Sequence, residues 1–108
     1  MPLARDTEAW RTAAEASTYR DEVERYLREH PDGAFHDREL ADALMGTGWA
    51  DGNATDRDYA DTMYLHDQLD ELVRSGVVEA RNVPTTRVDD PSIPDGTDYV
   101  TYFAHAGD

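Results

Sequence analysis

The sequence predicts one small α+β domain, mainly helical, that ends in a β-hairpin. The first observation is a stripe of leucines that leads into a glycine and an apolar pair: Leu65, Leu69, Leu72, Gly76, Val77 and Val78. The second is a helix with its own capping signals just before that stripe, over residues 36–46. The third is a pair of strand-like runs after it. With 108 residues, the chain has room for one modest core.

Residues 1–17 are expected to form a helical extension ahead of the main domain, which we assign to residues 18–108. Asp6 or Thr7 can cap a first helix that runs to about Ala16. Trp10 is the large apolar side chain of this helix. A short helix with one large aromatic residue needs a surface to pack on. That surface is either the body of the same chain or a second copy, and the sequence leaves both open.

The next helix is expected to begin at Ser17 or Thr18 and to end at His30, before Pro31. Its apolar side chains recur at helical spacing: Tyr19, Val23, Tyr26 and Leu27. A short extended segment follows at residues 34–35. The helix over residues 36–46 then has His36 as its cap residue, Glu39 in the capping-box position and Gly46 at its end.

The connection at residues 47–54 is longer than a tight helix-turn-helix turn, and Trp49 is expected to anchor it to the body. Thr55 and Asp58 form a variant capping signal for a long helix that ends at about Ser75. A helical wheel predicts one core face and one exposed face for this helix. The core face has Leu65, Leu69 and Leu72, extended by Thr62, Val73, His66 and Tyr59. The exposed face has Met63, Arg74, Asp67, Ala60, Glu71 and Tyr64.

Two strands are predicted after this helix, at residues 77–83 and 99–104. In the second, Val100, Tyr102 and Ala104 alternate with Thr101 and Phe103. The residues between the strands are rich in Pro, Asp, Gly and Thr, which are typical turn formers. The sequence therefore predicts a hairpin with an unusually long loop.

Composition excludes several classes of protein. The chain has no cysteine, so it has no disulfide framework, no thiolate nucleophile and no Cys-ligated zinc. No signal peptide or long apolar run is visible, so we expect a cytoplasmic protein. The formal net charge is −14, and all ten basic residues are arginine. Such a composition is typical of proteins from salt-accumulating, halophilic cells, although an acidic surface that serves a basic partner is the alternative.

The order of helix, short strand, helix, turn, helix and β-hairpin over about residues 18–104 resembles the winged helix-turn-helix family. The likeness is carried by the leucine stripe with Gly76, Val77 and Val78, and it is supported by Phe35 and the Glu39-Leu40-Ala41 start of the second helix. The resemblance implies a DNA-binding transcriptional regulator, commonly a homodimer. In this family the third helix enters the major groove, and the wing lies along the adjacent backbone.

The resemblance thus makes duplex DNA the first expected partner, with a transcription-regulating role in high salt. The candidate DNA contacts are Arg38, Arg57, Tyr64, Gln68, Arg81 and Arg87. The third helix departs from the family pattern, because it carries six acids against Arg57 and Arg74. Since non-specific DNA affinity comes mainly from neutralising phosphates, this acidic helix weakens the expectation.

The alternative is a winged-helix module that has lost DNA binding and binds another protein. Its candidate interface residues are Trp10, Met63 and Tyr64. Large apolar side chains on an exposed helix face are typical of protein interfaces.

No catalytic residues, cofactor or metal site are predicted. The four histidines, at 30, 36, 66 and 105, do not have zinc-ligand spacing. His66 and Asp70 are one helical turn apart, which favours a structural pairing over a catalytic one. Because no phosphate-binding loop or nucleophile motif is present either, we expect no enzyme.

Overall fold

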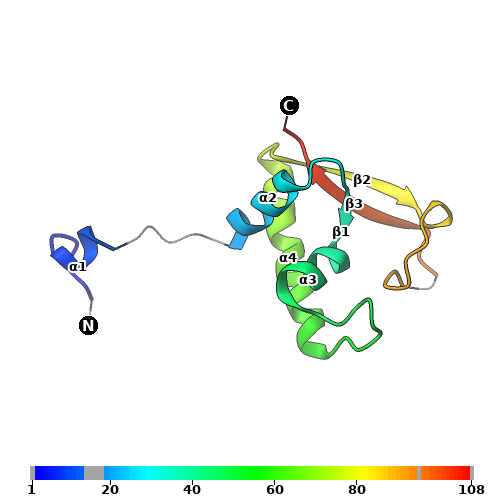
Figure 1. Cartoon of the computed structure of the whole chain (residues 1–108), viewed down its shortest axis with the longest axis horizontal. Coiled ribbons are helices and arrows are strands. Elements are labelled where there is room, and N and C mark those ends of the chain that lie inside the picture. Colours follow the sequence, from blue (N-terminus) through cyan, green and yellow to red (C-terminus); the bar gives the residue numbers. More distant parts are fainter. Residues whose placement is uncertain (1, 14–18, 95, 108) are drawn as a thin grey trace.

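The computed structural model describes residues 2–13, 19–94 and 96–107 of the chain. Their elements follow in the order α1 (Glu8–Arg11), α2 (Tyr19–Glu29), β1 (Phe35–His36), α3 (Asp37–Met45), α4 (Asp56–Arg74), β2 (Val78–Pro84), a short 3-10 turn η1 (Thr85–Arg87) and β3 (Tyr99–His105) (Figure 1). The α+β fold class is therefore confirmed. None of the helices among these residues has the length and apolarity to cross a bilayer.

Helix α1 is shorter than expected. Its cap is Thr7, whose hydroxyl accepts the N–H of Trp10, and the helix ends at Arg11. The predicted continuation to about Ala16 lies in part outside the described residues. No residue of α1 is buried, and Trp10 is 50% exposed. Among the described residues, the Trp10 indole is therefore not buried against the main domain.

Helix α2 packs through Val23 and Leu27, both fully buried, with Tyr19 and Tyr26 partly buried beside them. The start expected at Ser17 or Thr18 lies outside the described residues. The helix ends at Glu29, before the predicted boundary at Pro31. The apolar spacing of 3–4 residues therefore identified the core side of this helix.

Both predicted capping boxes are confirmed. In α3, the His36 side chain accepts the N–H of Glu39, and the Glu39 carboxylate accepts the N–H of His36. In α4, Thr55 and Asp58 make the same reciprocal pair. Gly46 ends α3 with φ +70°, a backbone conformation that glycine adopts without a steric cost.

The leucine stripe of α4 is buried as predicted. Thr62, Leu65, Leu69 and Leu72 form its covered side, and Gly76 with φ +82° turns the chain into β2. The prediction for Tyr59 was wrong, because its side chain is 57% exposed. This tyrosine lies in the first turn of α4, which the 47–54 loop covers only in part, and Trp49 meets the tyrosine ring in an edge contact.

The three strands form one antiparallel sheet in the order β1-β3-β2. The predicted hairpin is present, with strand limits moved by about one residue. The pairing of β1 with β3, which sets Phe35 opposite Phe103, was not predicted. Helices α2, α3 and α4 cover the sheet face that carries Val78 and Phe103. The buried core consists of Val23, Leu27, Leu40, Ala41, Leu65, Leu69, Leu72, Val78 and Phe103.

Candidate functional site

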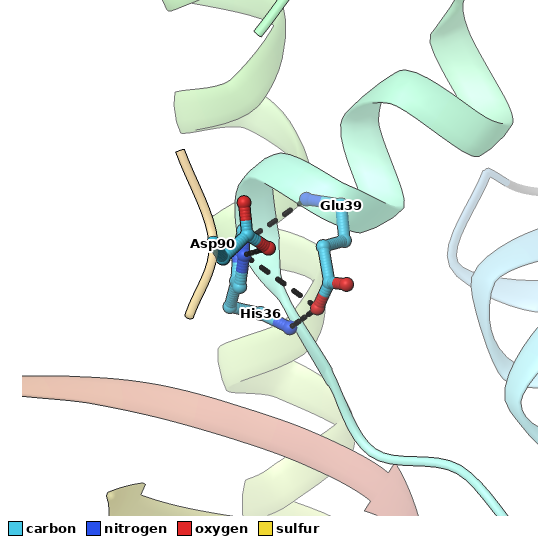
Figure 2. A group of neighbouring side chains, drawn as sticks. All are labelled: His36, Glu39 and Asp90. Atoms are coloured by element: carbon cyan, nitrogen blue, oxygen red, sulfur yellow. Dashed lines mark hydrogen bonds and ion pairs between the residues drawn. The ribbon is translucent and has the colours of Figure 1, made fainter. Parts of the chain in front are cut away.

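The first residues of α3 are joined to the long loop between β2 and β3. His36 is 1% exposed and uses both ring nitrogens. Its Nδ1 accepts the Glu39 N–H at 3.3 Å, so the ring proton belongs on Nε2, which lies 2.8 Å from Asp90 Oδ2. Figure 2 shows His36 between the two carboxylates. We call His36, Glu39, Asp90 and Ser92 the clasp, because they hold the loop on α3.

Asp90 is the acceptor at the centre of the clasp. Its Oδ1 accepts the Ser92 hydroxyl at 2.7 Å and the Ser92 N–H at 2.9 Å, while Oδ2 accepts from His36. Burial by itself raises the pKa of Asp90. The hydrogen bonds that Asp90 accepts from Ser92 and His36, together with the electrostatic attraction of His36, lower the pKa by more. The pKa of Asp90 is therefore held below its usual value. The ionised form of Asp90 is thus the form that stabilises the loop.

Three groups of the clasp lie close enough together to suggest a metal site. Ligand atoms of His36, Glu39 and Asp90 are all within 4.8 Å of one another. A cation on Nε2 of His36 would move the ring proton to Nδ1, where it would meet the N–H of Glu39. The Glu39 carboxylate also already accepts the His36 N–H at 3.1 Å. These bonds favour a structural cluster over a metal centre.

The clasp also brings together a serine, a histidine and an aspartate, but their geometry is not that of a nucleophilic triad. The Ser92 hydroxyl donates to Asp90 and lies 3.4 Å from Nε2 of His36. Because that nitrogen carries the ring proton, it cannot accept the serine proton. Ser92 is also 5% exposed. The three residues therefore hold the loop and do not activate a nucleophile.

Arg38, which follows the clasp histidine by two positions, was predicted to contact DNA. The structure places its guanidinium carbon 3.8 Å from the centre of the Trp49 ring. Its Nη1 donates to the Ser92 carbonyl at 2.7 Å. Stacking and this hydrogen bond fix the direction of the guanidinium. Arg38 is thus part of the junction between the β2–β3 loop and the α3–α4 loop.

Trp49 anchors the α3–α4 loop, as the sequence predicted. Its indole N–H donates to Thr62 Oγ1 of α4 at 2.8 Å. Asp42 of α3 holds the same loop by accepting the Thr47 hydroxyl and the backbone N–H groups of Trp49 and Ala50. The loop that carries Trp49 is therefore fixed to both helices that it connects.

The exposed side of α4 carries three large side chains, which we call the α4 face: Tyr59, Met63 and Tyr64. They are 57%, 51% and 50% exposed. The ring of Tyr64 lies 5.7 Å from that of Tyr19 in α2, measured between ring centres. Burial, followed by the charges of Glu22 and Asp61 and by Tyr64, raises the pKa of Tyr19 to about 12. The neutral tyrosine therefore borders an acidic surface.

The remaining predicted DNA contacts do not form one cluster with Arg38. Arg57 is exposed in the first turn of α4, and Gln68 is partly buried farther along that helix. Arg81 is exposed on β2 and pairs with Glu79 at 3.7 Å. Arg87 is exposed in the 3-10 turn after β2. The structure groups only Arg38 with the clasp and Trp49.

Sequence reasoning missed the part played by Asp90 and Ser92. Both belong to a loop whose composition predicted turns. The capping position of His36 was the local signal that this histidine has a structural role. Its long-range partner had no comparable signal, because 54 positions separate His36 from Asp90. Comparisons with protein-family models, curated proteins and solved structures found no match for this chain.

Proposed function

We propose that this chain is a winged-helix module that binds another protein through the α4 face. The order α2, β1, α3, α4, β2, β3 supports the winged-helix assignment, because it repeats the helix, strand, helix, helix and hairpin order of that family. The buried leucines of α4 and the turn at Gly76 support it as well.

The observation that carries the proposal is the exposure of Tyr59, Met63 and Tyr64 on one helix. Tyr59 and Met63 are four positions apart and therefore neighbours along the helix surface. Tyrosine and methionine are enriched at protein interfaces, where an apolar centre is surrounded by a polar rim. Here the rim contains exposed acids of the same helix, Asp67 and Glu71 among them. A partner with a matching apolar patch and basic rim fits this face.

Electrostatics disfavour a DNA-reading role for the same helix. Helix α4 has acids at 56, 58, 61, 67, 70 and 71. Of its two arginines, Arg74 pairs with Glu71 at 3.1 Å. Arg38 is held by Trp49 and Ser92, and Arg81 is paired with Glu79. DNA affinity depends on cations that replace phosphate counterions, so these placements reduce it.

Duplex DNA is the second candidate partner, and one residue favours it. Arg57 is exposed at the start of α4, and within the described residues it makes no ion pair. In molar salt the Debye length falls to about 3 Å, which screens the repulsion between an acidic protein and phosphates. A DNA-binding regulator of the winged-helix type would use Arg57 before any other arginine of this helix.

A capture experiment from native lysate in molar potassium chloride separates the two candidates. Three baits are compared: the wild-type chain, a Met63→Asp variant and an Arg57→Ala variant. Bound proteins and bound DNA are both sequenced. We expect proteins that the wild-type chain and the Arg57→Ala variant retain and that the Met63→Asp variant loses. Equal capture by all three baits would refute the α4 face as the binding surface.

The opposite pattern identifies a DNA-binding protein. In that case the wild-type chain enriches a defined DNA sequence, Arg57→Ala loses it, and Met63→Asp retains it. A homodimer, which the family resemblance also implies, is tested with the same variants by light scattering in molar potassium chloride. A dimer that only Met63→Asp dissociates would identify the partner as a second copy.

A further inference from the structure

A cavity of about 390 Å³ lies between the β2–β3 loop and the α3–α4 loop. We propose that it binds a small organic anion, specifically a carboxylate with an apolar body. Its charged wall is Arg38 and its apolar wall includes Trp49 and Ile93. Pro91 and Pro94 complete the loop side. Its lining shares no residue with the α4 face, although Trp49 meets the ring of Tyr59 in an edge contact, and the inference does not depend on the proposed protein partner.

The charge of this cavity differs from that of three other cavities on this acidic chain. Arg38 is the single charged residue among the described residues that line it. Three other cavities on the described surface each include at least one carboxylate: Glu79 in one, Asp21, Glu24 and Glu71 in another, and Asp89 and Asp90 in the third. The chain has a net charge of −14, yet the described residues of this lining include an arginine and no carboxylate. This cavity therefore favours an anion.

The Arg38 guanidinium is positioned before any ligand arrives. Trp49 stacks on it, and one of its five N–H groups donates to the Ser92 carbonyl. No carboxylate pairs with Arg38 among the residues that the structure describes, whereas Arg28, Arg74 and Arg81 each have one. A held guanidinium binds a carboxylate with little loss of rotational freedom, and the planar fork matches the two carboxylate oxygens.

The shape and lining of the cavity define the rest of the ligand. Small-molecule sites usually have volumes of about 300–1,000 Å³ and combine apolar walls with polar groups. In this cavity the polar part of the lining is larger than the apolar part. The indole of Trp49 and the aliphatic side chain of Ile93 provide the apolar walls here. Inorganic phosphate or chloride would leave those walls in contact with water. A carboxylic acid with a ring or a short hydrocarbon body satisfies both parts of the lining.

The two tryptophans of the chain provide a direct test. Each gives one indole N–H signal in a nitrogen-15 correlation spectrum, and Trp10 lies outside the cavity lining. The full chain is titrated in molar potassium chloride with benzoate, phenylacetate or cyclohexanecarboxylate at constant ionic strength. Benzamide is the uncharged control. We expect a saturable shift of the Trp49 signal, no shift of the Trp10 signal, and no response to benzamide.

Variants identify the group that recognises the anion. Arg38→Gln is expected to weaken carboxylate binding by about tenfold or more, since it removes charge-assisted hydrogen bonds. Arg25→Gln changes an exposed arginine of α2 outside the lining and is expected to bind as the wild-type chain does. Thermal unfolding checks that the variants fold. If Arg38→Gln does not fold, Ile93→Asp puts a repelling carboxylate into the lining and is expected to abolish binding.

Three results would overturn the inference. The first is that none of the three carboxylates gives a saturable shift of Trp49. The second is equal binding of benzamide, or of inorganic phosphate, because either would show that charge and apolar body are not recognised together. The third is wild-type affinity in Arg38→Gln or, where that variant does not fold, in Ile93→Asp. None of these results depends on the capture experiment with the α4 face, so the two proposals can fail separately.

Discussion

His36 and Asp90, which are 54 positions apart in the chain, are joined by a 2.8 Å hydrogen bond between Nε2 and Oδ2. The same histidine caps α3 through Nδ1. One buried imidazole ring therefore caps helix α3 and also holds the β2–β3 loop in position. Asp90 in turn accepts two hydrogen bonds from Ser92, so the loop conformation depends on this carboxylate.

Replacement of Asp90 by alanine is expected to lower the free energy of unfolding by about 1–3 kcal/mol near neutral pH. The pKa of Asp90 is lowered in the folded chain, so its contribution is present above its pKa in the unfolded chain. That contribution is lost as the pH falls through the folded-state pKa. Chemical denaturation of both proteins across acidic pH measures the difference. Asp89→Ala, in the exposed neighbour, is the matched control, and a difference that does not shrink in acid would contradict the assignment.

Trp49→Phe is expected to destabilise the chain by about 1–3 kcal/mol, because it removes the hydrogen bond to Thr62 and weakens the stacking on Arg38. Trp10→Phe is the control and should change stability by less than about 0.5 kcal/mol, since that indole is half exposed. A double-mutant cycle with Thr62→Val isolates the hydrogen bond. A coupling energy of zero would show that the bond contributes nothing to stability.

Tyr19 is expected to lose its proton later than an ordinary tyrosine. Desolvation is the largest cause of its raised pKa of about 12, against 10.0 for a free tyrosine, and Glu22 and Asp61 add to it. Because the folded-state pKa is raised, the stability that neutral Tyr19 contributes is present below pH 10 and is lost as the pH rises towards 12. Ultraviolet titration of the phenolate signal measures this. Tyr19→Phe should remove the late phase, and Tyr59→Phe, in an exposed tyrosine, should not.

Gly76→Ala is expected to cost about 1–2 kcal/mol of stability, because φ is +82° at the turn from α4 into β2. A methyl group there would meet no atom within 4 Å, so backbone strain is the whole cost. Gly76→Asn should recover part of the loss, since asparagine tolerates this conformation better than alanine. Thermal unfolding of the three proteins gives the order. Equal stability of the glycine and alanine forms would rule out strain at this turn.

Local signals in the sequence predicted most of the helical part of the fold. The capping pairs His36–Glu39 and Thr55–Asp58 need only neighbours three positions apart, and both are confirmed. The leucine spacing of α4 also gave the buried face correctly. The prediction that Tyr59 is buried failed for a physical reason. A helical wheel assumes that one side of a helix is covered along its whole length, and Tyr59 is exposed. The end of α4 beside the 47–54 loop is covered only in part.

Long-range contacts were beyond the reach of sequence reasoning. Strand β1 has two residues, too few for an alternation pattern, and its partner β3 lies more than sixty positions later. The clasp was missed for the same reason, since Asp90 and Ser92 meet His36 only after the loop folds back. Arg38 was selected as a candidate DNA contact from its charge and its place on the second helix of the family pattern. Its stacking on Trp49 depends on the path of the α3–α4 loop, which the sequence did not specify.

The strand order β1-β3-β2 also has a consequence for how the chain acquires its structure. Among the strands of the described residues, the central one, β3, is synthesised after the other two, and both of these use it as their hydrogen-bonding partner. Helices α2, α3 and α4 can form beforehand, but the apolar surface that Phe103 covers stays open to water until then. Nascent chains that stall before residue 99 should therefore expose an aggregation-prone apolar surface and depend on chaperones.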